Sequence, residues 1–327
     1  MKDDKIIITK TPLRISFVGG GTDMPYFYNR YNGATISLAI NRYIYVTVKY
    51  HNNYQEKYRL NYSKTENTNK ISNIKNLRIK NVIKLLKIKK PLYINTFADI
   101  PTNSGLGSSS AFTVGLILAL SKLKKKNLTK KQLAEMAYKI ESKITNNSLG
   151  KQDHYICAFG GFKHIRYKKS KVNFTSININ KNNLKDFKKS IFLVWTGKNR
   201  FATNVLKDQK KNYLKNISKL IKMNMFTQLF KREIYKSKIS VKNLSNIISD
   251  TWELKKNFSN LITNNEIDKL LENLKTKGAY GGKLLGAGNG GFLLTFVPLE
   301  KKNKLLKTLK RYKYLDIEVD NNGSEIL

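Results

Sequence analysis

The chain has 327 residues, more than a single hydrophobic core usually serves, so we expect two domains. Its 40% apolar content suffices for packed globular domains. The longest apolar run, residues 111–120, is too short to span a bilayer, and the N-terminus lacks the apolar segment of a signal peptide. A single cysteine, Cys157, and three histidines exclude a disulfide framework and argue against a Cys- or His-rich metal site. We expect a cytoplasmic protein in which Cys157 is buried packing.

The charge balance is unusual, because 62 Lys and Arg stand against 22 Asp and Glu, a net charge of +40. Such a balance suggests a polyanionic partner, with nucleic acid as the first candidate. However, the basic runs are scattered, for example at 122–131, 207–215 and 219–233, and lysine also fills ordinary helix faces. We therefore favour compositional drift and regard nucleic-acid binding as a remote alternative. A basic surface also attracts small anionic substrates.

The first predicted element is a strand over residues 10–20. Leu13, Ile15 and Phe17 alternate with Arg14 and Ser16, the period of two that is typical of a strand. Arg14 is therefore predicted to face away from the apolar side. Further strands are predicted at 41–51 and 90–100, followed by a helix over 109–122.

A second helix is marked by a capping box, since Thr129 is followed three residues later by Gln132. Its apolar stripe consists of Leu133, Met136, Ala137, Ile140 and Ile144. Glu141 lies beside this stripe, whereas Glu135 faces away. Taken alone, Glu141 is either a boundary residue or a site residue.

After about residue 166 the sequence changes character. A strand is predicted at 190–197, a long Lys-rich helical region to about Leu274, a strand at 291–298, another helix, and a last strand near 314–319. Strands, then helices, then strands again predict an α+β fold in two lobes. We expect the domains to cover residues 1–175 and 176–327.

Three glycine-containing segments are candidates for ligand contact. The first, "PTNSGLGSSSAF" (101–112), leads from a glycine loop into a helix, whose free N–H groups and dipole favour an anion. Its serines can cap the helix or bind Mg²⁺. The Walker A pattern is absent, and an ordinary serine-capped helix is the alternative.

The other two segments are less specific. "LLGAGNGGFLL" (284–294) matches G-x-G-x-x-G, but a β-rich run follows it, so a tight turn between strands is favoured over a dinucleotide site. Asn289 suits such a turn because asparagine tolerates positive φ. In "FVGGGTDMPYF" (17–27), Asp23 is either a turn residue or a site residue.

These segments, in this order and spacing, resemble the three motifs of the GHMP kinases: "TPLRISFVGGGTD", "PTNSGLGSSSA" and "KLLGAGNGGFLL". Within that group, the chain is similar to the D-glycero-D-manno-heptose 7-phosphate kinases, with supporting stretches at 150–162, 196–202, 250–256 and 278–288. The resemblance implies an α+β fold with an N-terminal domain like ribosomal protein S5 domain 2 and a ferredoxin-like C-terminal domain. It also implies ATP and Mg²⁺ as cofactors.

Site residues follow from the resemblance position by position. Asp153 matches the catalytic aspartate, and Arg14 the arginine that keeps it ionised and stabilises the transferred phosphoryl group. Glu141 and Ser109 match the pair that holds the metal. The implied ATP-binding residues are Pro101, Ser104, Gly105, Leu106, Gly107, Ser108, Ser109 and Ser110. The implied substrate-binding residues are Gly21, Thr22, Asp23, Arg200 and Gly288.

The resemblance implies transfer of the γ-phosphate of ATP to the anomeric hydroxyl of D-glycero-D-manno-heptose 7-phosphate, giving the 1,7-bisphosphate for nucleotide-activated heptose and surface polysaccharide. Galactokinases carry Glu-His where this chain has Gly20 and Gly21, which disfavours galactose. Arg200 either holds the 7-phosphate or is structural. The alternative within the family is a 1-kinase for another sugar or sugar phosphate. The expected partners are ATP, a sugar phosphate and, in a homo-oligomer, a second copy of the chain. No membrane partner is expected.

Overall fold

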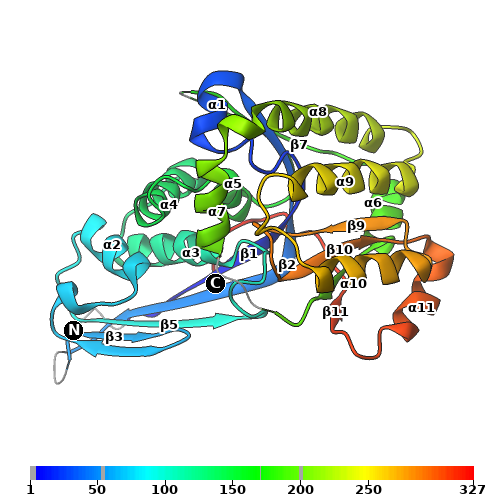
Figure 1. Ribbon diagram of the computed structural model, residues 1–327. Helices are drawn as coiled ribbons and strands as arrows, with labels where there is room; N and C mark the ends of the chain where they lie inside the picture. Colours follow the sequence, from blue (N-terminus) through cyan, green and yellow to red (C-terminus); the bar gives the residue numbers. More distant parts are fainter. Residues whose placement is uncertain (1–4, 53–55, 170, 199–201) are drawn as a thin grey trace.

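The protein is described by a computed structural model that covers residues 5–52, 56–169, 171–198 and 202–327. It contains two sheets, each with its own set of helices (Figure 1). Among the described residues, no helix is both long enough and apolar enough to cross a membrane.

The first sheet has eight strands, ordered β12-β1-β2-β5-β3-β4, with β6 on β2 and β7 on β6. The strands are β1 Ile7–Val18, β2 Gly33–Tyr50, β3 Tyr58–Asn61, β4 Thr65–Thr68, β5 Leu92–Ala98, β6 Phe162–Tyr167, β7 Val172–Ser176 and β12 Glu325–Ile326. β2 is 18 residues long, and its first part pairs with β6 while its second part pairs with β5. This shared strand joins the two ends of the sheet.

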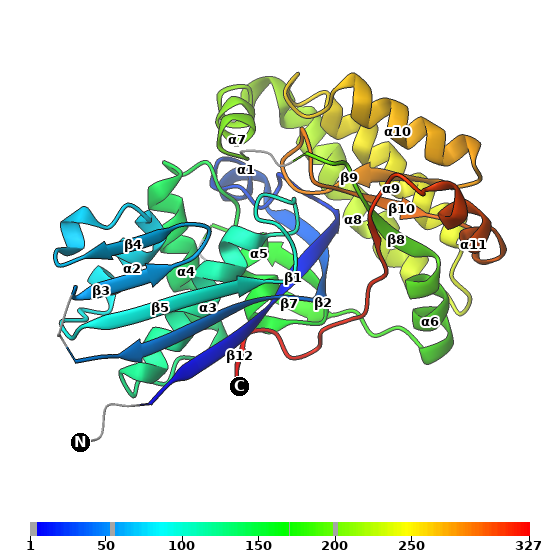
Figure 2. The ribbon, with the colours of Figure 1, turned by 90° about the horizontal axis from the view of Figure 1, so that it is seen from below.

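Helices cover one face of this sheet, with α3 packed on β1 and β2 and in contact with α4 and α5 (Figures 1 and 2). The helices of this unit are α1 Pro25–Tyr31, η1 Ile71–Asn73, α2 Leu77–Leu85, α3 Ser108–Leu123, α4 Lys130–Ile144 and α5 Gln152–Phe159. The capping box at Thr129 and Gln132 is confirmed at the start of α4. α3 is apolar on nearly all sides because it is enclosed by the sheet and its neighbouring helices.

The second sheet has four strands, ordered β11-β8-β10-β9. They are β8 Ile191–Trp195, β9 Gly281–Leu284, β10 Phe292–Phe296 and β11 Tyr314–Leu315. The accompanying helices are α6 Lys181–Lys189, α7 Ala202–Lys211, η2 Leu214–Asn216, α8 Ile217–Ile234, α9 Val241–Lys256, α10 Asn265–Thr276 and α11 Leu299–Thr308. The segment between β9 and β10 is a turn between antiparallel strands, and Asn289 adopts φ of 60°, as the sequence predicts.

The two units share a continuous apolar core. Phe17 at the end of β1 contacts Phe187 of α6 at 5.5 Å and Phe230 of α8 at 5.4 Å between ring centroids. Along β8, Ile191 and Leu193 belong to this shared core, while the intervening residues face a second core on the other side of the second sheet. The units therefore hold a fixed relation around the end of β1.

Several strands, among them β3, β4, β6, β7 and β12, were not expected from the sequence. After β11 the chain returns to the first sheet, where Val319 bridges Ile40 and β12 pairs with β1 (Figure 2). The last residues thus belong to the first sheet, although the expected second domain ran without interruption from 176 to 327. Two residues are too few to show the hydrophobic alternation by which a strand is predicted.

Candidate active site

A cavity of about 420 Å³ lies where the two units meet, around the end of β1. Its first wall comes from the first unit and includes Arg14, Asp153 and Glu141. Its second wall comes from the second unit and includes Lys255 and Lys283. A cavity at an interface with a few convergent polar groups is the usual form of a ligand site.

The serine-rich loop forms one end of this cavity. Gly105 and Gly107 have φ of 85° and 78°, a left-handed conformation that glycine adopts without strain. Gly107 is the N-cap of α3, and a Cβ there would lie 3.2 Å from Cγ of Arg14. The two glycines therefore let the loop lie against the arginine and direct the first turn of α3 at the cavity.

Two serine hydroxyls of this loop have unused hydrogen-bonding capacity. The Oγ atoms of Ser104 and Ser108 are buried and have no partner within the described part of the chain, and both residues line the cavity. Buried hydroxyls normally find a partner, so these two are ready to bind a ligand oxygen. Of the eight predicted ATP-binding residues, six line the cavity, namely Ser104, Gly105, Gly107, Ser108, Ser109 and Ser110. Pro101 is exposed, and Leu106 is buried with its carbonyl accepting from the Arg14 amide at 3.0 Å.

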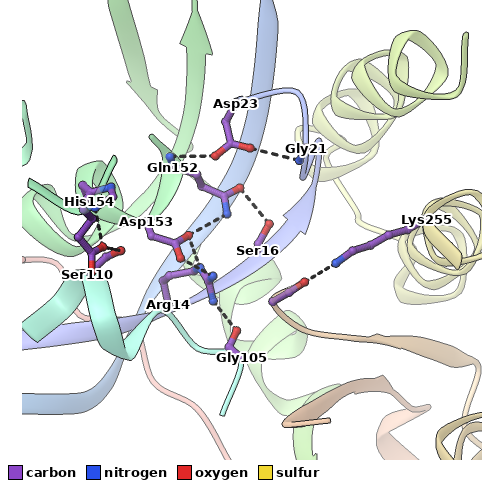
Figure 3. Close-up of polar contacts among 12 residues, drawn as sticks. Arg14, Ser16, Gly21, Asp23, Gly105, Ser110, Gln152, Asp153, His154 and Lys255 are labelled. Atoms are coloured by element: carbon purple, nitrogen blue, oxygen red, sulfur yellow. Dashed lines mark hydrogen bonds and ion pairs between the residues drawn. The ribbon is translucent and has the colours of Figure 1, made fainter. Parts of the chain in front are cut away.

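Arg14 and Asp153 form a bidentate ion pair at the centre of the first wall (Figure 3). Nε and Nη2 of Arg14 each lie 2.7 Å from a carboxylate oxygen of Asp153, and Nη1 donates to the carbonyl of Gly105 at 2.6 Å. Burial opposes ionisation of Asp153, but the adjacent guanidinium outweighs it and holds the pKa of Asp153 below its usual value. The pair links β1, the start of α5 and the glycine loop.

Asp23 sits beside this pair. Its carboxylate accepts from the amides of Gly21 at 3.2 Å and Gln152 at 3.1 Å, and burial raises its pKa against the effect of these bonds. Gln152 connects Asp23 to the ion pair, because its backbone amide donates to Asp23 while its side chain donates to Asp153 at 3.2 Å and accepts from Ser16 at 2.9 Å (Figure 3). Asp23 therefore lines the cavity as a fixed acceptor at its edge.

Glu141 is 1% exposed and has three partners. Arg78 donates to one oxygen, while Ser110 at 2.7 Å and the ring of His154 at 2.8 Å contact the other. Burial alone would raise the pKa of Glu141, but the charge of Arg78 and the contact with His154 lower it far below its usual value. Glu141 is thus a buried, charged carboxylate at the cavity, rather than a boundary residue.

The predicted metal ligands Ser109 and Glu141 both line the cavity. A carboxylate has about four acceptor positions, and three at Glu141 are filled, which leaves one for a cation. Among the described residues, no three His, Cys, Asp or Glu side chains group as a metal site. Mg²⁺ commonly binds through one or two carboxylates together with substrate phosphates, so a hydroxyl and a single carboxylate beside a phosphate loop fit that ion.

The remaining predicted substrate residues are spread out. Gly21 lines the cavity, whereas Thr22 is buried and its hydroxyl bonds the carbonyls of Gly19 and Ala34, both at 2.8 Å. Gly288 is buried beside the cavity, where a Cβ would lie 2.6 Å from the backbone of Ile262. Arg200 lies outside the described residues. Cys157 is buried in the shared core, as expected.

Several cavity residues escaped the sequence-based prediction, namely Arg78, Gln152, Lys255 and Lys283. Lys255 and Lys283 lie in stretches that carry the family resemblance, but in a chain so rich in lysine nothing marked them as site residues. Gly150 begins another such stretch, and a Cβ there would lie 1.9 Å from an oxygen of Asp23, so a glycine is needed for the carboxylate to approach. The sequence signal available for Gly150 was its position shortly before Asp153, which the resemblance marks as a site residue.

Comparison with known proteins agrees with this geometry. The sequence pattern of the GHMP kinases N terminal domain matches residues 76–161, and that of the GHMP kinases C terminal region matches residues 228–315. The chain is 30% identical to the D-glycero-alpha-D-manno-heptose 7-phosphate kinase of Campylobacter jejuni over 94% of both sequences. The chain belongs to the GHMP kinases. It is therefore a phosphotransferase with an alcohol group as acceptor, from a family that uses ATP as donor.

Solved structures show the same GHMP kinase fold. A putative sugar kinase from Campylobacter jejuni superposes with a TM-score of 0.74 at 24% identity, covering 99% of this chain and 98% of that one. The galactokinase of Lactococcus lactis, solved with galactose, gives 0.78 at 18% identity, with coverage of 99% and 95%. The expected fold class, α+β with an N-terminal and a C-terminal GHMP kinase domain, is confirmed.

Proposed function

We propose that this GHMP kinase transfers the γ-phosphate of ATP to the anomeric hydroxyl of D-glycero-D-manno-heptose 7-phosphate. The product would be the 1,7-bisphosphate, a precursor of nucleotide-activated heptose for surface polysaccharide. The similarity to the Campylobacter jejuni heptose phosphate kinase over 94% of both chains carries this proposal. Gly20 and Gly21 support it, because they line the cavity at the positions where galactokinases carry Glu-His.

In the proposed reaction, Asp153 acts on the acceptor hydroxyl. It accepts the hydroxyl proton as the sugar oxygen bonds the γ-phosphorus and the bond from that phosphorus to the β–γ bridging oxygen breaks, leaving ADP. The low pKa of Asp153 makes it a weak base, which suits a loose transition state in which the proton moves late. Orientation of the hydroxyl is then its main contribution.

Arg14 holds Asp153 in place by two hydrogen bonds and adds positive charge where the phosphoryl group passes. The serine loop offers backbone N–H groups and the free hydroxyls of Ser104 and Ser108 to the donor phosphates. Mg²⁺, held by Glu141 and Ser109, would neutralise phosphate charge when bound. Asp23 would accept a hydrogen bond from a sugar hydroxyl.

The test is an ADP-release assay with ATP and a panel of acceptors: the heptose 7-phosphate, its dephosphorylated form, galactose, fucose, mevalonate and homoserine. We expect turnover with the heptose 7-phosphate, and phosphorus NMR should show a new anomeric phosphate. Turnover of mevalonate or homoserine alone would overturn the proposal. Turnover of a different sugar phosphate would keep the sugar kinase and replace its substrate.

A further inference from the structure

Two lysines of the second wall have no role in the scheme above. Lys255 on α9 and Lys283 on β9 line the same cavity as Arg14 and Asp153. Lys283 is only 6% exposed. Burying a lysine is unfavourable unless its ammonium group is paired, so its place in a cavity wall needs an explanation.

Lys283 is held by a neutral group. Its Nζ donates to the carbonyl of Phe17 at 2.6 Å, at the end of β1 just before the glycine turn of the first motif. Within the described residues it forms no ion pair with a carboxylate. An ammonium has three N–H donors, so this bond leaves others for a ligand. Burial lowers the pKa of Lys283 well below its usual value, and the charges of Lys255 and Arg14 add to this, so an anion bound beside Lys283 would stabilise its charged form.

Lys255 is oriented toward the same region. Its Nζ donates to the carbonyl of Gly286, in the turn that follows β9. In Figure 3 it enters from the second unit, on the opposite side of the site from Asp153 and Arg14. The two lysines therefore approach the cavity from adjacent elements, since α9 packs on β9.

The charges of the cavity do not balance. Its lining contains four basic and three acidic side chains, namely Arg14, Arg78, Lys255, Lys283, Asp23, Glu141 and Asp153. Each arginine is paired with one acid of the first wall. Among the described lining residues, the second wall contributes two lysines and no acidic side chain, and it shares the cavity with the Gly20 and Gly21 turn, whereas the donor phosphates are assigned to the serine loop.

We propose that Lys283 and Lys255 bind the phosphate already carried by the acceptor sugar, so that they select sugar phosphates over free sugars. This inference rests on the proposed sugar-kinase function. A phosphate dianion meets the requirement of this wall because two cations can share its three terminal oxygens. The first wall is thereby left free for the reacting hydroxyl at the other end of the acceptor.

The decisive variant is Lys283→Met, which keeps the length of the side chain and removes its charge. We expect the KM for the heptose 7-phosphate to rise about 30-fold or more, because a buried cation facing a phosphate is lost. The KM for ATP should stay within about 3-fold, and the preference for the phosphorylated over the dephosphorylated heptose should fall by a similar factor. Lys255→Met should act in the same direction, and Lys283→Arg should restore part of the preference.

The matched control is Lys124→Met. Nζ of Lys124 also donates to a backbone carbonyl, that of Leu86 at 2.7 Å, but at the C-terminal end of α3 and outside the cavity lining. It should leave both KM values unchanged. Circular dichroism and the melting temperature establish that each variant is folded. Should Lys283→Met not fold, inorganic phosphate provides the test on Lys255→Met: it should compete with the sugar phosphate in the wild type and bind more weakly in the variant.

The outcomes separate the two proposals. If the wild type prefers another sugar phosphate and Lys283→Met weakens it, the heptose assignment fails and the lysine inference stands. If the wild type prefers unphosphorylated acceptors, the lysine inference is overturned, whichever sugar is used. A raised KM for ATP with an unchanged KM for the acceptor overturns it as well, because the lysines would then serve the nucleotide.

Discussion

The charged side chains on the two walls of the candidate active-site cavity have different kinds of partner. On the first wall, Arg14 pairs with Asp153 through two hydrogen bonds, and Glu141 is enclosed by three partners. On the second wall, the ammonium groups of Lys283 and Lys255 donate to backbone carbonyls. The first arrangement pairs opposite charges before a ligand arrives, whereas Lys283, which forms no ion pair with a carboxylate among the described residues, can still meet an anion.

Under the proposed mechanism, this difference assigns a different part of the reaction to each wall. Phosphoryl transfer requires positioning, and the groups proposed to act on the reacting atoms are the ones fixed by directional pairs. Recognition of a phosphate requires net positive charge, which a lysine supplies as a mobile point charge. The predictions below test this division, from the largest expected effect to the smallest.

Asp153→Asn should lower kcat by about 10³-fold or more, because the hydroxyl loses its proton acceptor and Arg14 loses its partner. The KM for ATP should change little. Steady-state kinetics with both substrates measures this, and Asp316→Asn is the control, since Asp316 pairs with Lys302 on the surface at 65% side-chain exposure. A kcat near that of the wild type would show that Asp153 takes no part in the phosphoryl transfer.

Arg14→Lys keeps the charge of the first wall and removes the bidentate geometry. We expect kcat to fall about 100-fold, because an ammonium cannot make both bonds to Asp153 and the bond to Gly105 in one plane. Lys283→Arg, the reverse exchange on the second wall, should lose less than about 10-fold in kcat/KM. Equal losses in the two variants would contradict the division between the walls.

The carboxylates of the first wall should control stability in acid. The pKa values of Asp153 and Glu141 are lowered in the folded state, so their contribution is present above the unfolded values of about 4 and is lost as the pH falls through the folded values. The contribution of these two carboxylates to the free energy of unfolding should therefore be steady from pH 7 to about 5 and decline below about 4.

Glu141→Gln should lower the free energy of unfolding at pH 7 by about 3 kcal/mol, since Arg78 and His154 lose a charged partner. Its difference from the wild type should shrink in acid. Urea denaturation at a series of pH values measures both effects, with the largely exposed Glu318→Gln as control. A constant difference between pH 7 and 3 would show that Glu141 does not contribute as a charged group.

Thr129→Ala gives the smallest effect and separates stability from function. It removes the capping box of α4, which should cost about 1 kcal/mol of stability, and Thr129→Ser should retain most of it. Neither variant should alter kcat or either KM, because the cap lies outside the cavity lining. A change in KM would mean that a loss of stability alone alters the cavity. The KM changes of the other variants would then not report on the replaced side chains.

Much of the site was accessible from local sequence patterns. The alternation of Leu13 and Ile15 with Arg14 placed the arginine on the face that lines the cavity. The glycines and serines of residues 104–110 predicted a loop that opens into a helix, and the family motifs pointed to Asp153. These signals are local, because each depends on residues that lie close together in the sequence.

The rest could not be predicted because it depends on contacts between distant residues. The bond from Lys283 to Phe17 joins residues 266 apart, and the pair of Arg78 with Glu141 joins residues 63 apart. His154 follows Asp153 directly in the sequence, but its ring contacts Glu141 at 2.8 Å. Nothing in a chain so rich in lysine marks which lysine will be buried.

The sequence by itself determined several of the strands and helices, the loop of glycines and serines before α3, and the family resemblance, because hydrophobic period, capping residues and glycine conformation are local properties. Only the tertiary structure decided how charge is divided between the two walls. That division arises because packing around Phe17 brings β9 and α9 of the second unit against the end of β1. Burial in that contact then determines which ionisable groups find a partner and which are left to meet a ligand.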